Sequence, residues 1–249
     1  SFSASYGSPA YRRDMAAALQ RLGAYLRQAD VGKLVVGFSL TGGNDGQWYD
    51  NSQVFASYAS NRKGFTGVIP RGPQLDHSPG HQQGFREWLR EIYHNDLSAL
   101  RRAWRDPKVS FETATVCSES ARNPPALFVA DRRVIDSNYY AQIAPARLVK
   151  FFAATLKQAI GRPVFSMTYY PDLSDPARLN KFALAEILGG PDRMDSVTAV
   201  HGYESWRKLG STGVTFAAWG SHRLRRTAQV SEIDYRTYRS RWEGFWNRY

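Results

Sequence analysis

Apolar residues recur at helical spacing near the start of the chain. Ser8 and Pro9 provide an N-cap and a first-turn proline, and one face then carries apolar side chains at Met15, Leu19, Leu22 and Leu26. This pattern predicts an amphipathic helix that ends at about Gln28. The nearly continuous apolar run over residues 34–40 is instead typical of a strand buried on both faces of a parallel sheet.

The same alternation continues along the rest of the chain. Cap residues and apolar spacing predict further helices over residues 79–92, 97–104, 131–160 and 176–188. Short apolar runs predict strands over residues 163–169, 196–202 and 228–232. The proline-containing stretch 105–130 is expected to be an irregular segment. Strands that alternate with helices indicate an α/β fold with a parallel sheet, and we expect residues 1–249 to form one domain.

An open dinucleotide-binding sheet and a closed barrel both fit this alternation. A dinucleotide-binding fold needs a G-x-G-x-x-G motif between its first strand and the following helix. The segment 42–46 contains glycines at Gly42, Gly43 and Gly46, but no helix is predicted directly after it. We therefore expect no nucleotide cofactor.

The composition excludes several classes of protein. With 249 residues, of which 43% are hydrophobic, the chain can bury a sizeable core. No stretch reaches the roughly 18 apolar residues of a membrane span, so we expect no membrane partner. The single cysteine, Cys117, cannot form an internal disulfide or a cysteine-built zinc site.

The net charge of +11 makes nucleic acid a partner to consider. The basic residues do not form a run of about five to eight, which is the pattern that basic nucleic-acid patches show. They occur as scattered pairs, which are Arg12-Arg13, Arg101-Arg102, Arg132-Arg133 and Arg225-Arg226. A basic nucleic-acid-binding domain is therefore the third of our hypotheses, and we expect no nucleic-acid partner.

Polar and aromatic side chains gather where predicted strands end, at residues 44–49, 201–206 and 231–236. Aromatic residues make up 14% of the chain, and rings beside carboxylates and amides suit a sugar-binding cleft as well as a packed core. Glu232 follows a buried strand directly, although an ion pair with a neighbouring arginine is an alternative role for it. His201 has no second histidine or cysteine at ligand spacing, so we expect no metal site.

Three collinear segments resemble the β-galactosidase-like glycoside hydrolases of family 42 and their relatives. Residues 35–49 read VVGFSLTGGNDGQWY and are similar to the GxxxGGxxGEW region that carries the acid/base glutamate of that family. Residues 77–104 are similar to its YSP…FRxWLRxxYG…LxxAWG stretch, and residues 221–237 to the stretch that holds its nucleophile. The matches extend over about residues 8–238 of the chain.

The resemblance implies a (β/α)8 TIM barrel and a retaining glycosidase that acts on β-linked sugars, with a β-galactoside-like substrate. It implies Glu232 as the nucleophile and position 47 as the acid/base, with the two side chains about 5 to 5.5 Å apart. The residues that would contact the sugar, by ring stacking or through its hydroxyl groups, are Asp45, Trp48, Tyr49, His201, Tyr203, Glu204, Trp219 and Asp234.

Gln47 departs from the family pattern. A glutamine cannot donate and regain a proton as a carboxyl group does, so the leaving group would depart unprotonated. Either the sequence is an engineered Glu→Gln variant, or the protein is a natural homologue without the acid/base. The leading hypothesis is a glycosidase in an acid/base-disabled form, and the alternative is a non-catalytic carbohydrate-binding protein.

The resemblance begins at the third strand of the family's barrel and lacks the eighth. We therefore expect this chain to contain only the middle and C-terminal strands of a barrel. Such a chain would be an excerpt of a longer polypeptide, or would be completed by another chain or in a homo-oligomer.

Overall fold

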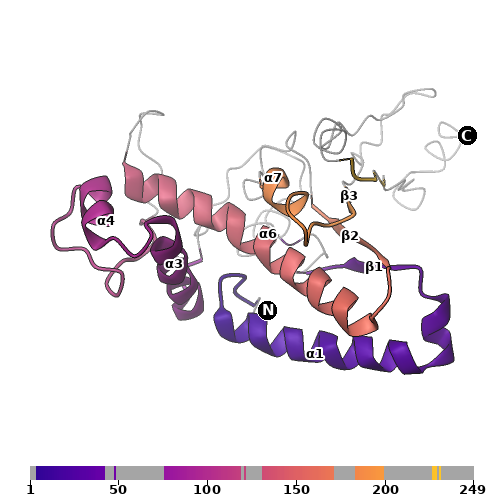
Figure 1. The fold of residues 1–249 in the computed structure, drawn as a ribbon. Coiled ribbons are helices and arrows are strands. Elements are labelled where there is room, and N and C mark those ends of the chain that lie inside the picture. The colour runs from indigo at the N-terminus through magenta and orange to yellow at the C-terminus, as the bar shows by residue number, and fades with distance from the viewer. Residues whose placement is uncertain are drawn as a thin grey trace, which may run out of the picture.

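The structure is a computed structural model that describes residues 4–42, 48, 76–118, 121, 131–170, 183–198, 226–228 and 230. Its elements in chain order are α1 (Pro9–Gln28), the 3-10 helix η1 (Asp30–Leu34), β1 (Gly37–Leu40), α3 (Pro79–Ile92), α4 (Leu97–Trp104), α6 (Arg132–Ile160), β2 (Phe165–Tyr169), α7 (Leu184–Ile187) and β3 (Ser196–Thr198). Figure 1 shows α1 and α6 side by side, with the short strands beyond them.

The long helices begin at the residues that the sequence predicted. Ser8 and Ser78 each accept a hydrogen bond from a first-turn amide, and a proline follows each of them at the first helical position. Asp96 and Asp131 cap α4 and α6 in the same way. These caps satisfy amides that have no partner within their own helix, which is why the helix boundaries could be read from the sequence.

The strands form one parallel sheet in the order β1-β2-β3. Gly37 is paired with Phe165, and Thr168 is paired with Val197. The predicted strands near 34–40, 163–169 and 196–202 are therefore confirmed, although each is shorter than predicted in the part that the structure describes. Of the predicted strand 228–232, only residues 228 and 230 are described, and neither is assigned to a strand.

The expected TIM barrel is wrong. The described residues form a small open sheet of three strands and are mostly helical, so no closed ring of strands is present among them. Alternating strands and helices predict parallel pairing equally well for an open sheet and for a barrel. Closure depends on pairing between edge strands, which this local pattern does not encode.

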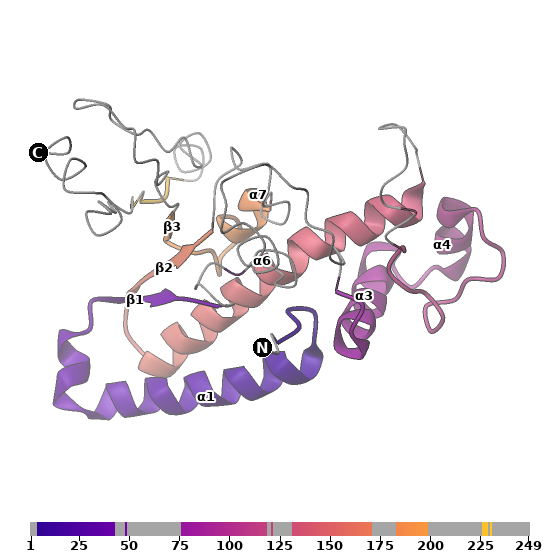
Figure 2. The ribbon, with the colours of Figure 1, turned by 180° about the vertical axis from the view of Figure 1, so that it is seen from behind.

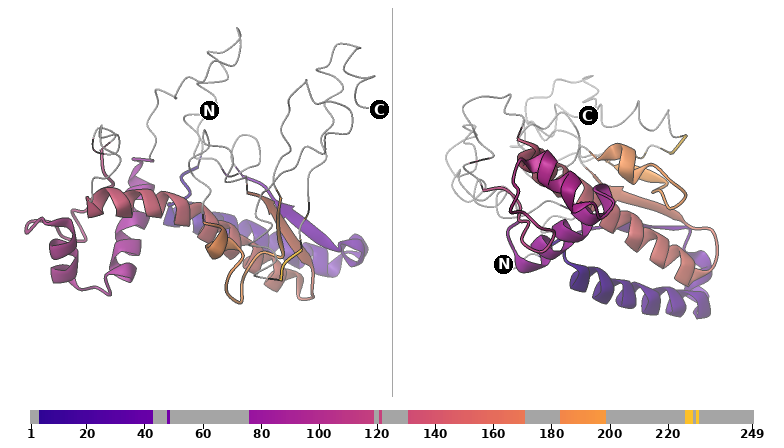
Figure 3. Two further views of the ribbon diagram at one scale, coloured as in Figure 1. Left: turned by 90° about the horizontal axis from the view of Figure 1, so that it is seen from above. Right: turned by 60° about the vertical axis from the view of Figure 1, so that its left-hand side comes forward.

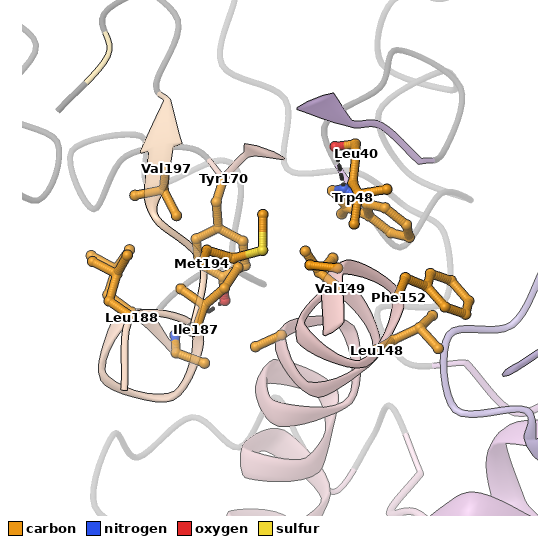
Figure 4. Close-up of a cluster of buried hydrophobic side chains, with 14 of the residues drawn as sticks. Leu40, Trp48, Leu148, Val149, Phe152, Tyr170, Ile187, Leu188, Met194 and Val197 are labelled. Atoms are coloured by element: carbon orange, nitrogen blue, oxygen red, sulfur yellow. Dashed lines mark hydrogen bonds between the residues drawn. The ribbon is translucent and has the colours of Figure 1, made fainter. Parts of the chain in front are cut away.

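The main core lies between α6 and the sheet (Figure 4). Leu148, Val149 and Phe152 of α6 face Leu40 at the end of β1 and the buried ring of Tyr170. Side chains of α1 pack against the same cluster and against the last turns of α6. Seen from behind in Figure 2, α1 follows α6 along much of its length.

A second core surrounds α3, α4 and the first half of α6. It is centred on Phe85, Leu89 and Leu100, which are fully buried, and it includes Phe111 of the irregular segment after α4. Figure 3 shows α3 and α4 at the end of α6 that lies away from the sheet. Because α6 contributes to both clusters, this helix joins the two cores.

Asp195 links the N-terminal ends of β2 and β3. Its Oδ2 atom accepts hydrogen bonds from the amide and hydroxyl of Ser166, each at 2.8 Å, and lies 2.5 Å from Lys157 Nζ. Partial burial alone would raise the pKa of Asp195, but these donors hold it below its usual value. One carboxylate thus links the end of α6 to the starts of β2 and β3.

No helix within the described residues has both the length and the apolar character needed to cross a membrane.

Candidate functional site

The candidate site is at the C-terminal edge of the sheet. Because β1, β2 and β3 are parallel, their C-terminal ends lie at the same edge. The chain leaves β1 after Leu40 and β3 after Thr198, just ahead of the polar and aromatic clusters at 44–49 and 201–206. Ligand sites in open α/β sheets commonly form at this edge.

Trp48 is fixed at this edge by hydrogen bonds at both its backbone and its ring. Its amide donates to the Gly42 carbonyl oxygen at 2.9 Å. Its indole Nε1 donates to Thr168 Oγ1 at 2.9 Å and to the Leu40 carbonyl oxygen at 3.2 Å. The ring therefore ties the segment after β1 to the last residues of β1 and β2.

The Trp48 ring is part of the core. It is 2% exposed, and its centroid lies 5.7 Å from that of Tyr6 and 6.3 Å from that of Phe152. Its backbone has a φ of 58°, an uncommon left-handed conformation for a large residue. These contacts give Trp48 a structural role, and its predicted stacking on a sugar ring stays a prediction.

Two threonine hydroxyls lie near the C-terminal ends of β2 and β3. Thr168 Oγ1 donates to the Leu40 carbonyl oxygen at 2.7 Å while accepting the indole hydrogen bond. Thr198 is 1% exposed, and its Oγ1 has no hydrogen-bond partner among the described residues. A buried hydroxyl without a partner is costly, so Thr198 offers a free polar group at the end of β3.

Tyr170 directly follows β2 and is hydrogen-bonded to the end of β3. Its amide donates to the Thr198 carbonyl oxygen at 3.0 Å, and its hydroxyl oxygen accepts a hydrogen bond from the Ala183 amide at 3.2 Å. Burial raises the pKa of the Tyr170 phenol, so the group stays protonated at neutral pH.

Of the residues predicted for the site, the structure describes Trp48 alone. The others lie outside the described residues and are Asp45, Gln47, Tyr49, His201, Tyr203, Glu204, Trp219, Glu232 and Asp234. Their proposed roles stay predictions. Among the described residues, no group of histidine, cysteine or acidic side chains could hold a metal ion.

The sequence analysis did not single out Thr168 and Thr198. The available signal was a hydroxyl at every second position of an otherwise apolar strand, as in Ser166 and Thr168. Such a pattern places hydroxyls on one buried face of a strand, where they need partners.

Neither a protein-family model nor a curated protein matches this chain.

Proposed function

We propose that this chain is a carbohydrate-active protein of the retaining glycoside hydrolase type, acting on β-linked sugars, in which the acid/base position is occupied by Gln47. Glu232 is the nucleophile in this proposal. The observation that carries it is the shared edge of β1 and β3, from which the chain continues towards Gln47 in one case and towards His201 in the other.

The position of Trp48 supports the placement of residue 47 at this edge. Trp48 is held against Leu40 and Thr168, and Gln47 is joined to it by a single peptide bond. Consecutive Cα atoms are about 3.8 Å apart across a trans peptide, so we expect residue 47 to lie near the strand ends.

A second backbone contact supports the same location for Glu232. The Ala228 amide donates to the Asp195 carbonyl oxygen at 3.1 Å, directly before the start of β3. The strand predicted over residues 228–232, if parallel to β3, would advance about 3.3 Å per residue from Ala228. We therefore expect Glu232 to lie level with the C-terminal end of β3.

The chemistry follows from the two side chains. In a retaining mechanism the Glu232 carboxylate attacks the anomeric carbon and forms a glycosyl-enzyme ester, while the leaving oxygen takes a proton from the acid/base. Gln47 has no such proton to give, and it cannot activate the water that hydrolyses the ester. Only substrates with good leaving groups can therefore react, and their glycosyl-enzyme intermediate should accumulate.

Gln47 itself favours a second candidate, a carbohydrate-binding protein that does not cut its ligand. In that case the edge of the sheet binds sugar through its polar and aromatic groups, and residue 47 has no catalytic role. The two candidates differ in whether a carboxyl at position 47 produces hydrolysis.

The test is Gln47→Glu, assayed with an aryl β-galactoside and an aryl β-glucoside of high leaving-group pKa. The glycosidase proposal expects turnover by the variant but not by the parent protein. For the parent protein, a 2,4-dinitrophenyl glycoside should give a pre-steady-state burst, and azide should speed turnover because it attacks the ester without a general base.

Glu232→Gln and Glu204→Gln are the paired controls. Loss of the burst in Glu232→Gln, with the burst retained in Glu204→Gln, supports the assigned nucleophile. The opposite result moves the nucleophile to Glu204. A Gln47→Glu protein that binds sugar but hydrolyses nothing supports the binding protein and overturns the glycosidase.

A further inference from the structure

A cavity lies between α1, α3 and α6, away from the strand ends. Its volume is about 670 Å³, within the range of about 300 to 1,000 Å³ that is common for small-molecule sites. Its lining comes from these helices and the turn before α1, and none of it comes from β1, β2 or β3. The cavity is therefore separate from the candidate site at the edge of the sheet.

The cavity combines an apolar floor with a charged rim. Ala16, Ala144 and Leu148 contribute small or aliphatic side chains to its lining. Arg12 comes from α1, and Glu87 comes from α3. An apolar pocket with a few polar groups is typical of sites that bind small organic ligands.

Most of the charges around the cavity already have partners. Arg147 Nη1 lies 2.7 Å from Glu91 Oε2, and Arg13 Nε lies 3.0 Å from its neighbour Asp14. Both of these guanidinium groups are therefore engaged by carboxylates of the protein itself.

Arg12 differs from the other two arginines. Among the residues that the structure describes, no carboxylate pairs with it. Its guanidinium carbon lies 4.0 Å from the centroid of the Phe151 ring, which also lines the cavity. Stacking on a ring positions a guanidinium but leaves its N–H donors, which lie in the guanidinium plane, free to bind an acceptor. Arg12 is therefore available to an anionic ligand.

Trp88 provides a second donor without an acceptor. It lines the cavity, it is 4% exposed, and its indole Nε1 is buried with no hydrogen-bond partner among the described residues. A buried N–H without an acceptor costs about 1 to 3 kcal/mol.

The first turn of α1 adds to the same polarity. The turn from Gly7 to Pro9 lines the cavity, and the first turn contains no acidic residue. The N-terminus of a helix favours negative charge, so this wall of the cavity suits an anion.

We propose that this cavity binds a small organic anion, a carboxylate or a phosphate ester with a compact apolar body. Arg12 binds the anionic group at the α1 wall, and the apolar floor receives the body. Glu87 of α3 sets the orientation of the ligand, because its carboxylate repels the anionic end.

Titration calorimetry at fixed ionic strength tests this site with phenyl phosphate and benzoate as anionic probes. Benzyl alcohol is the neutral probe of similar size. At least one anionic probe should bind at least about tenfold more tightly than benzyl alcohol. Arg12→Ala should remove this preference, whereas Glu87→Gln should strengthen anion binding.

Arg21→Ala is the matched control. Arg21 is an exposed arginine of the same helix that does not line the cavity, so its loss changes the net charge equally. It should alter the dissociation constant less than about twofold, whereas Arg12→Ala should weaken binding at least about tenfold. Circular dichroism establishes that both variants are folded, and Arg12→Gln replaces Arg12→Ala if the latter does not fold.

Three results would overturn the proposal: no binding of either anion at millimolar concentration, equal binding of benzyl alcohol, or equal losses in the Arg12 and Arg21 variants. The last result would assign the binding to the overall positive charge. None of these outcomes depends on glycosidase activity.

Discussion

A single buried imidazole makes the folded chain sensitive to acid. His81 is 3% exposed, and neither of its ring nitrogens has a hydrogen-bond partner within the described residues. Burial lowers its pKa from 6.5 to about 4, although Asp76, whose carboxylate lies 3.5 Å from His81 Nδ1, opposes this shift. The imidazole is therefore neutral at pH 7 and does not form an ion pair there.

The lowered pKa of His81 makes the folded state less stable in acid. Between pH 6.5 and about pH 4 the unfolded chain protonates His81 while the folded chain does not. Stability should therefore be full above pH 6.5 and should fall as the pH is lowered, by up to about 1.4 kcal/mol per pH unit. Urea unfolding at several pH values measures this slope. His81→Phe should flatten it, whereas His94→Asn, at an exposed histidine, should leave it unchanged.

Trp48 and Trp88 offer a matched pair for measuring how much the hydrogen bonds of one buried indole N–H contribute to stability. Both rings are buried, but only the Trp48 indole donates to Thr168 and Leu40. Substitution by phenylalanine removes similar volumes at both positions, so Trp48→Phe should cost about 1 kcal/mol more than Trp88→Phe. Equal losses of unfolding free energy in urea would contradict the role of the Trp48 indole.

At the scale of the elements, one buried carboxylate holds α3, α4 and α6 together. Asp136 of α6 is 1% exposed and accepts hydrogen bonds from Tyr93 Oη, Trp104 Nε1 and Arg132 Nε at 2.7 to 2.8 Å. Burial and the bond to this carboxylate raise the pKa of Tyr93 to about 12, so its phenol remains a donor at neutral pH.

Asp136→Asn should lower the free energy of unfolding by about 1 to 3 kcal/mol, because an amide nitrogen replaces one acceptor oxygen among three donors. Tyr93→Phe removes a single bond and should cost less. Hydrogen exchange should increase over residues 79–104 in Asp136→Asn and stay unchanged in α1. An equal increase in both regions would contradict the local role of this carboxylate.

The contact between α1 and α6 depends on Gly23. A Cβ atom built at this position would overlap the side chain of Ala159. Alanine favours a helix over glycine by about 1 kcal/mol, so Gly23→Ala would stabilise an isolated α1. In the folded chain we expect a net loss of about 1 to 3 kcal/mol, read as a lower melting temperature. The exposed control Arg21→Ala should change the stability by less than about 0.5 kcal/mol.

The sequence pattern was sufficient for α1, α3, α4 and α6, but it did not predict η1 and was only partly sufficient for the sheet. Of the predicted helix 176–188, residues 176–182 lie outside the described residues, and α7 covers only Leu184–Ile187. Ser8, Ser78, Asp96 and Asp131 mark helix starts through local chemistry that needs no tertiary information. The burial of Trp48 depends instead on Thr168, which is 120 residues away in the sequence. Spacing along the chain carries no sign of such a contact, so the sequence did not reveal that the Trp48 ring packs in the core.

At the scale of the whole molecule, contacts at the N-terminal end of the sheet stabilise the fold, and the proposed site lies at the C-terminal end. Asp195 and its donors link the N-terminal ends of β2 and β3, whereas Gln47 belongs to the segment that follows the C-terminal end of β1. Asp195→Ala should therefore lower the free energy of unfolding by about 1 to 3 kcal/mol. Gln47→Glu and Glu232→Gln should change it by less than about 0.5 kcal/mol, measured in the same urea titration. A large loss in either of these would place that residue in the scaffold.

The barrel was the main error of the sequence interpretation, and its cause is physical. Leu34 to Leu40 and the later apolar runs fix the parallel direction of strands, since helices connect them. They leave the number of strands and the pairing of the edges undetermined. Family resemblance over the same segments supplied that missing information, and the open order β1-β2-β3 does not agree with it.

The separation between the Asp195 contacts and the proposed site at the C-terminal edge of the sheet also bears on how such a protein evolves. The Asp195 carboxylate stabilises the sheet without using any residue that follows a strand. Selection can then act on the segments at the opposite edge with little effect on folding, because most mutations are rejected through lost stability. In the proposed glycosidase, a lineage can therefore lose or regain a proton donor at position 47 while it keeps the same scaffold.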